Sequence, residues 1–241
     1  MSIYGSMLRL KRGPMRGLTF WATWVLTWAL LWPHSSPAQV PPSAEQAALY
    51  TGLHAKAQRG DLVGLMRMLA TKPDVNQRDP QGRTPLHVAT FAKQREVITA
   101  LAKAGADLGA LENDRYDAVT IAAVADDEET LRLLLSLGAS AKLVTSRYDG
   151  TALIAAAHLG HDGVVRQLIK AGAPLNHVNN LHWTALIEAV VLGQGGPRHV
   201  ATVRALVEAG ADKNRTDRDG RTALELARAR GYGEMVRWLG S

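Results

Sequence analysis

The stretch Gln81-Gly82-Arg83-Thr84-Pro85-Leu86-His87-Val88-Ala89 decides the fold, because it joins a tight turn to the start of a helix. The hydroxyl of Thr84 can cap that helix, and Pro85 fits its first turn since the missing N–H has no helical partner there. Gly105-Ala106-Asp107 begins 21 residues after Thr84, and its glycine can adopt the left-handed conformation that ends a second helix. The stretch therefore predicts a pair of helices between two turns.

Similar stretches recur along the chain at a nearly constant spacing. Thr151, Thr184 and Thr222 each open one, and degenerate copies begin at Thr51 and Asp117. The steps between successive copies are 33, 33, 34, 33 and 38 residues. Such a period indicates a serial array of helix pairs, in which each unit buries its apolar face against its neighbours.

The array resembles the ankyrin repeat family, whose period is about 33 residues and whose signature includes Thr-Pro-Leu-His. The resemblance covers residues 44–241 and implies an all-α solenoid of helix-turn-helix units joined by short turns or hairpins. The third unit departs most from the family, because Arg115 and Asp117 replace its Gly and Thr, so we expect this unit to open most easily. The expected units are residues 44–78, 79–111, 112–145, 146–178, 179–216 and 217–241.

Two segments of the array depart from the regular pattern. Ser43 and Gln46 have the spacing of a capping box, which predicts a long first helix from residue 44, preceded by a short extended linker at residues 39–43. The fifth unit carries five extra residues, Gln194-Gly195-Gly196-Pro197-Arg198, between its two helices. Glycine and proline are poor helix formers, so we expect an exposed loop whose deletion leaves stability and partner binding unchanged.

Residues 1–38 differ in composition from the rest of the chain. They contain basic but no acidic residues, and an uncharged apolar run of 15 residues, 18–32, is followed by Pro33 and by Ser36-Pro37-Ala38. This order is that of a secretory signal peptide, and the run is shorter than the roughly 20 residues of a membrane-spanning helix. The sequence predicts cleavage before Gln39, with an uncleaved anchor in the inner membrane as the alternative. Translation from Met1, Met7 or Met15 is compatible with this reading.

The charge and cysteine content exclude several classes of function. Residues 1–38 hold four of the 28 basic residues and none of the 22 acidic ones, which leaves a net charge of +2 for the remainder. A nearly neutral domain with an export signal is a poor candidate for nucleic-acid binding. The chain has no cysteine, which excludes disulfides, thiolate metal sites and cysteine nucleophiles.

No motif in the sequence carries a catalytic mechanism. The nucleophile elbow and the phosphate loop are absent, and we predict no catalytic residue, cofactor or metal. His158 and His161 are three residues apart, but no third metal ligand accompanies them. The acidic run Asp126-Asp127-Glu128-Glu129 fits the start of a helix, with a cation site or a basic partner as the alternative.

The resemblance implies a function in protein binding, with contacts on the turn tips and on the exposed side of the first helix of each unit. Aromatic and arginine side chains dominate binding hot spots, which favours the turns of this chain. The residues predicted to contact a partner are Arg83, Arg115, Tyr116, Arg147, Tyr148, His182, Trp183, Arg218 and Arg221 on the turns, and Phe91, Leu159 and Leu192 on the helices.

These observations together predict an exported, monomeric and non-catalytic module that binds a protein partner in the periplasm. After cleavage of the signal, no segment is expected to stay inserted in the membrane. One alternative is a secreted factor that acts on a host or competitor protein, and another is a metal-binding or hydrolytic protein.

Overall fold

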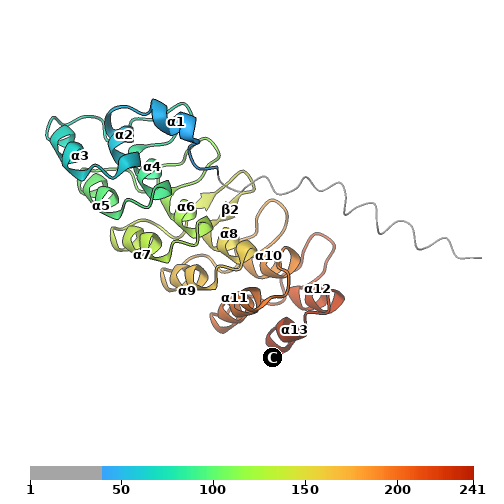
Figure 1. The fold of residues 1–241 in the computed structure, drawn as a ribbon. Coiled ribbons are helices and arrows are strands. Elements are labelled where there is room, and N and C mark those ends of the chain that lie inside the picture. Colours follow the sequence, from blue (N-terminus) through green and yellow to red (C-terminus); the bar gives the residue numbers. More distant parts are fainter. Residues whose placement is uncertain (1–39) are drawn as a thin grey trace, which may run out of the picture. The chain divides into compact units, whose positions relative to one another are not determined.

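The computed structural model describes residues 40–241, so the predicted signal peptide and its cleavage site lie outside the described residues. Within this range, helices follow one another in antiparallel pairs, and the pairs stack in two rows (Figure 1). After α1 (Ala44–Leu49), the first helices of the six pairs are α2 (Gly52–Arg59), α4 (Pro85–Phe91), α6 (Ala118–Val124), α8 (Ala152–Leu159), α10 (Ala185–Val191) and α12 (Ala223–Ala229). The second helices are α3 (Leu62–Leu69), α5 (Arg95–Lys103), α7 (Glu128–Ser136), α9 (Asp162–Lys170), α11 (Pro197–Glu208) and α13 (Gly233–Gly240).

The caps predicted from the sequence start the first helices. Thr84, Thr151, Thr184 and Thr222 each accept a hydrogen bond from the backbone N–H three residues later. Asp117 does the same for α6, with Oδ1 2.8 Å from the nitrogen of Thr120. A carboxylate therefore replaces the usual hydroxyl in the third unit without loss of the cap.

The core runs through the whole stack instead of forming one centre. Leu86, Leu153 and Leu186 occupy the same position in three units, and each is at most 1% exposed. Small alanines beside them allow first helices to pack closely on their neighbours, as in the pairs α6 with α8 and α8 with α10. Each unit contacts the next, which confirms the all-α solenoid of six helix pairs.

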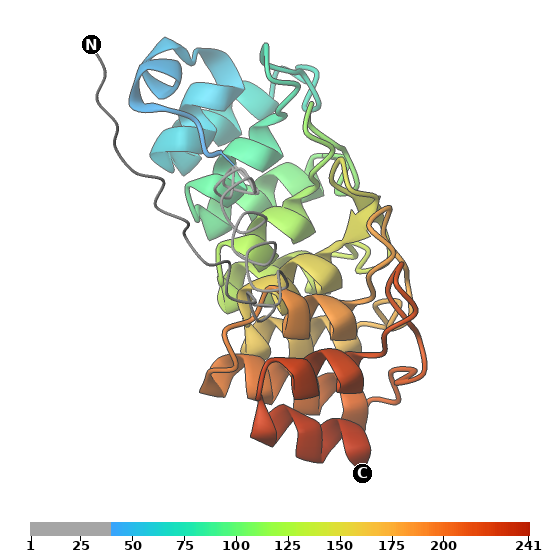
Figure 2. The ribbon, with the colours of Figure 1, turned by 90° about the vertical axis from the view of Figure 1, so that its right-hand side faces the viewer.

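Hairpins project from the same side of the stack, between the second helix of one pair and the first helix of the next (Figure 2). Among the described residues, one of them contains a two-stranded sheet, in which β1 (Val144–Thr145) runs antiparallel to β2 (Gly150–Thr151), and a single antiparallel bridge joins Thr216 to Thr222 in the last hairpin. A search of the described residues finds no helix with the length and apolar character needed to span a bilayer.

The first helix does not run long, as the sequence had suggested. The capping box of Ser43 and Gln46 is formed, but α1 ends after six residues because Tyr50 is extended. The hydroxyl of Tyr50 donates to Asp79 Oδ2 at 2.8 Å in the next unit, and Gly52 adopts a left-handed φ of 55°. These two features turn the chain into α2, so the predicted single helix is two.

The insertion in the fifth unit is also only partly a loop. Pro197 occupies the first turn of α11, where its missing N–H costs nothing. As a result α11 has 12 residues whereas α5, α7 and α9 have nine each. The prediction that Pro197 and Arg198 belong to an exposed loop is therefore wrong, and only part of the insertion lengthens the connection.

Candidate functional site

A recurring polar contact fixes each of the five hairpins. In the first, Asp79 Oδ1 accepts hydrogen bonds from the backbone nitrogens of Gln81 and Arg83, at 2.9 and 2.7 Å. In each of the other four hairpins, one side-chain oxygen accepts the same pair of hydrogen bonds from backbone nitrogens. The residues that provide this oxygen are Glu112, Ser146, Asn179 and Asp217. Burial raises the pKa of Glu112, against the opposing effect of these two backbone donors. The same type of side-chain to backbone contact therefore shapes every one of these tips.

Neighbouring tips are also bonded to one another. The backbone nitrogens of Asn113, Ser146 and Asn180 donate to carbonyls of the preceding tip at 2.9–3.0 Å. Two ion pairs cross between the third and fourth units, since Arg115 contacts Asp149 at 3.0 Å and Arg147 contacts Asp114. These two arginines were predicted to bind a partner, and both are exposed, but each already has an intramolecular carboxylate. Their charge is consequently balanced at the surface.

Three consecutive tips hold a residue other than glycine in the left-handed region of backbone conformation. Gly82 and Gly220 occupy this position in the first and last hairpins, with φ of 74° and 76°. Arg115, Asp149 and His182 occupy it in the middle three, with φ of 67°, 52° and 64°. A side chain is unfavourable there. Strain of this kind often accompanies binding sites, which draws attention to the middle hairpins.

The same region carries exposed apolar side chains. Val144 and Tyr148 lie in the hairpin before α8, and Val178 and Leu181 lie in the hairpin before α10. They are 39%, 52%, 37% and 38% exposed, and we call these four residues the hairpin patch. The nitrogen of Asn180 donates to the carbonyl of Tyr148 at 3.0 Å, which holds the two hairpins side by side. Leu159, at the end of α8, is 37% exposed.

Two residues predicted to contact a partner are buried, so that part of the prediction is wrong. Arg83 is 5% exposed and Tyr116 is 8% exposed. Each immediately precedes a helix cap, and Arg83 points back to the preceding unit, where its guanidinium donates to the carbonyl of Val40 at 2.9 Å and to Gln46. Burial raises the pKa of the Tyr116 hydroxyl to about 12. Both side chains hold the fold and are not available at its surface.

The remaining predicted residues divide by exposure. Tyr148, His182, Arg218, Arg221 and Leu159 are exposed, whereas Trp183, Phe91 and Leu192 are half-buried. Trp183 packs on the core and Phe91 lies beneath the guanidinium of Arg83. Arg221 is paired with acids of its own hairpin, Asp217 and Asp219, and Arg218 donates to the carbonyl of Asn180 at 3.1 Å.

The histidines serve mainly to join segments of the backbone. Ring nitrogens of His54, His87, His161, His177 and His199 each lie 2.6–3.0 Å from a backbone carbonyl. Burial lowers the pKa of His87 to about 4, so its ring is neutral at physiological pH. The pair singled out in the sequence faces different partners, since His161 bonds Ala123 and His158 faces Glu188. Within residues 40–241, no cluster of three metal-ligating side chains is present.

The acidic run at the start of α7 binds the arginines of this chain. Asp127 caps α7 through the nitrogen of Thr130 and pairs with Arg95 at 3.0 Å. Burial opposes ionisation of Asp127, but the bonds from Thr130 and Arg95 outweigh it and lower its pKa. Glu129 also pairs with Arg95, and Asp126 with Arg198. The predicted role at a helix start accounts for this run.

The sequence analysis did not single out a buried acid in the fifth unit. Glu188 on α10 is 5% exposed, and its Oε1 lies 3.3 Å from Nδ1 of His158. Its other carboxylate oxygen has no hydrogen-bond partner among the described residues. The signal was in the sequence, because Val88 and Ile121 occupy the same position in other units.

Comparisons with known proteins agree with this architecture. A family model described as ankyrin repeats matches residues 40–112 and 119–217, and a second matches residues 197–239. The ankyrin repeat protein YahD of Escherichia coli (strain K12) is 36% identical over 184 residues, 76% of this chain and 91% of its own. An ankyrin repeat domain of Acinetobacter baumannii AYE is 43% identical with a TM-score of 0.74, covering 78% of this chain and 95% of that one. The ankyrin repeat domain of Bcl-3, of the IkappaB family, is 28% identical with a TM-score of 0.71, over 80% and 86%.

Proposed function

Because the chain belongs to the ankyrin repeat family, we propose that it is a protein-binding module that acts in the periplasm and contacts its partner through the hairpin patch. Ankyrin repeats are protein–protein interaction modules, and nothing in the described residues points to catalysis. The open questions for this chain are which surface binds and where in the cell it does so.

The hairpin patch is the observation that carries the proposal. Among the described residues, nine large apolar side chains are exposed, and five of them are the hairpin patch and Leu159. Leu159 lies at the end of α8 away from the hairpins, whereas the four residues of the hairpin patch lie on two bonded neighbouring hairpins. Exposed apolar side chains rimmed by polar groups are typical of interaction sites. Arg115 and Arg147 form such a rim, but their charges are already paired. We therefore expect apolar contacts at Tyr148 and Leu181 to supply most of the binding free energy.

Site-specific photo-crosslinking in living cells tests this surface. A photoreactive amino acid at residue 148 or residue 181 should give an adduct with a second protein. Gln81 stands at the equivalent position of the first hairpin and is the matched control, because it lies outside the patch. Adducts at residue 81 but not at residues 148 and 181 would contradict the proposed surface.

The periplasmic address rests on the sequence of residues 1–38. Their basic, apolar and small-residue segments follow the order of a signal peptide, and a cleaved signal delivers a protein to the periplasm of a two-membrane bacterium. Cell fractionation followed by intact-mass measurement should recover a chain that begins at or near Gln39. Recovery from the culture medium would favour the secreted factor, and a full-length chain in the membrane fraction would favour the anchored form.

A further inference from the structure

The other four exposed apolar side chains belong to the N-terminal part of the described chain. Val40, Leu49, Val63 and Met66 are 54%, 81%, 63% and 54% exposed. Val63 and Met66 lie on α3, the second helix of the first unit. The terminal helix of a solenoid normally turns a polar face to water. The helix α13 at the other end does so, with the exposed pair Glu234 and Arg237, which makes the apolar surface of α3 unusual.

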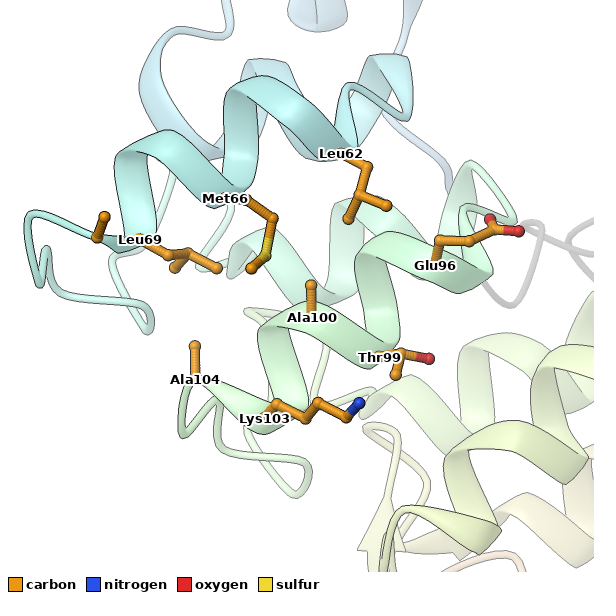
Figure 3. A pocket seen from close by; sticks show the side chains of 9 residues that line it. Leu62, Met66, Leu69, Glu96, Thr99, Ala100, Lys103 and Ala104 are labelled. Atoms are coloured by element: carbon orange, nitrogen blue, oxygen red, sulfur yellow. The ribbon is translucent and has the colours of Figure 1, made fainter.

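A groove of about 630 Å³ lies between α3 and α5, next to this surface (Figure 3). Leu62, Met66 and Leu69 line it from α3, and Ala100 forms part of its floor on α5. The groove between α9 and α11 is smaller, about 240 Å³, and is lined by Arg166, Arg204 and Glu208. The groove beside α3 is therefore the apolar one of the two.

One acidic and one basic residue of α5 lie at the two ends of the apolar groove. Glu96 and Lys103 lie on α5 at opposite ends of the lining, seven residues or roughly 10 Å apart along the helix. Both side chains are exposed, and neither forms an ion pair with another residue in the described part of the chain. A two-fold axis between them would place Glu96 of one molecule beside Lys103 of another, and the reverse. The face is complementary to itself, as an isologous interface requires.

We propose that a second copy of this chain covers the groove, with α3 and α5 of each molecule packed antiparallel across α3 and α5 of the other. The antiparallel arrangement pairs each Glu96 with the Lys103 of the other copy and buries Met66, whose flexible side chain fits an irregular gap. We choose a second copy as the occupant because the unpaired acid and base lie on the same helix. When two copies of α5 lie antiparallel, each acid meets the base of the other copy. This contact is separate from the hairpin patch. It makes the proposed form a dimer, whereas the sequence analysis expected a monomer.

Sedimentation velocity of the chain as recovered from the cell tests the proposal. Between about 1 and about 300 µM protein, the mass should rise toward that of a dimer, as for a small interface. Glu96→Lys and Lys103→Glu should each weaken dimerisation at least about tenfold, because like charges then meet. The double variant E96K/K103E should restore it to within about threefold. Lys170→Glu, at the equivalent position of α9, is the matched control and should leave it unchanged.

Thermal unfolding of each variant shows whether the fold persists, and all of these positions are exposed, so we expect unchanged midpoints. A photoreactive residue at position 63 supplies an independent readout, with an adduct of twice the chain mass as the expected product. A monomer at every concentration overturns the proposal. So does a dimer that the single charge reversals leave intact, a failure of the double variant to recover, or an adduct at position 63 with another protein.

Discussion

Arg198 donates to both carboxylate oxygens of Asp126, at 3.0 and 2.8 Å, although 72 positions separate the two residues. Its Nε also donates to Asp162 at 3.3 Å, so one guanidinium joins the start of α11 to the third and fourth units. Burial acts to raise the pKa of Asp162, but hydrogen bonds from Arg166 and Arg198 outweigh it and lower that pKa. The insertion in the fifth unit therefore supplies a clamp across its neighbours.

We expect Arg198→Ala to lower the free energy of unfolding by about 0.5–1 kcal/mol at low salt, since the pairs are half exposed. The loss should shrink in about 1 M NaCl, where the Debye length is about 3 Å. Urea unfolding of the single variants Arg198→Ala and Asp126→Ala and of the double variant measures the coupling. For the same reason, deletion of residues 194–198 should lower the stability slightly. The sequence analysis had predicted that this deletion leaves the stability unchanged. A coupling free energy of zero between Arg198 and Asp126 at low salt would show that this ion pair does not stabilise the fold.

The parts of the fold that local interactions determine could be predicted from the sequence. A cap involves residues three positions apart, so Thr84, Thr151 and Thr184 start helices where their spacing indicates. The same holds for Gly105 and Gly172, which end second helices with φ of 91° and 78°. The period then fixes the number of units, because each unit needs a neighbour to bury its apolar face.

The parts that depend on contacts between units could not be predicted. Arg83 and Tyr116 were expected to be exposed because they belong to turns, but the orientation of a turn side chain depends on the unit before it. The break after α1 likewise depends on Asp79, 29 residues beyond Tyr50. The candidate surface was predicted in part: Tyr148 and His182 are exposed, whereas Val144 and Val178 were not singled out.

His87 should make the stability of the stack depend on pH. Its ring nitrogen lies 2.9 Å from the carbonyl of Ala110 and 3.1 Å from that of Tyr116, and burial lowers its pKa from 6.5 to about 4. Between about pH 4 and pH 6.5, the unfolded chain therefore binds a proton at His87 that the folded chain does not bind. This contribution is complete above pH 6.5 and is lost as pH falls toward 4, by on the order of 3 kcal/mol.

Urea unfolding at several pH values between about 7 and 4 measures this dependence. His87→Gln should flatten the slope, because glutamine bonds the same carbonyls without titrating. His182→Asn, at an exposed tip where asparagine tolerates the left-handed backbone, is the control and should keep the parental slope. An unchanged slope in His87→Gln would show that other groups govern acid unfolding.

Asp117 should destabilise the third unit at neutral pH. Its side chain is 1% exposed and forms no ion pair among the described residues, and burial raises its pKa above 3.8 despite the bonds from Thr120. The folded chain therefore holds the proton more tightly than the unfolded chain, so stability falls as pH rises from 3.8 through the folded pKa. The unfavourable effect is complete at neutral pH.

Asp117→Thr restores the family residue and keeps the cap, so we expect a gain of about 1 kcal/mol at neutral pH that fades toward pH 4. Hydrogen exchange should show residues 112–145 as the segment that opens first in the parent and slower exchange there in the variant. Asp107→Thr, at an exposed position, should have little effect. Destabilisation by Asp117→Thr, or a parental segment 112–145 that exchanges most slowly, would contradict this account.

His182 allows backbone strain and partner binding to be separated at one residue. It has a φ of 64° at the tip beside Leu181, where Gly82 and Gly220 stand in other hairpins. We expect His182→Gly to raise the free energy of unfolding by about 1 kcal/mol, since glycine adopts this conformation without strain. Gly220→His is the reverse change at the equivalent position, where an added Cβ meets no atom within 4 Å, and it should destabilise by a similar amount.

The crosslinking yield at residue 148 in the two variants then tells whether His182 contacts the partner. If its imidazole belongs to the binding surface, His182→Gly should be more stable than the parent and yet give less adduct. Gly220→His should be less stable and give the parental yield, because its tip lies outside the hairpin patch. A parental yield in His182→Gly would restrict the interface to the apolar side chains, and a lower stability would show that the left-handed backbone at this tip carries no strain.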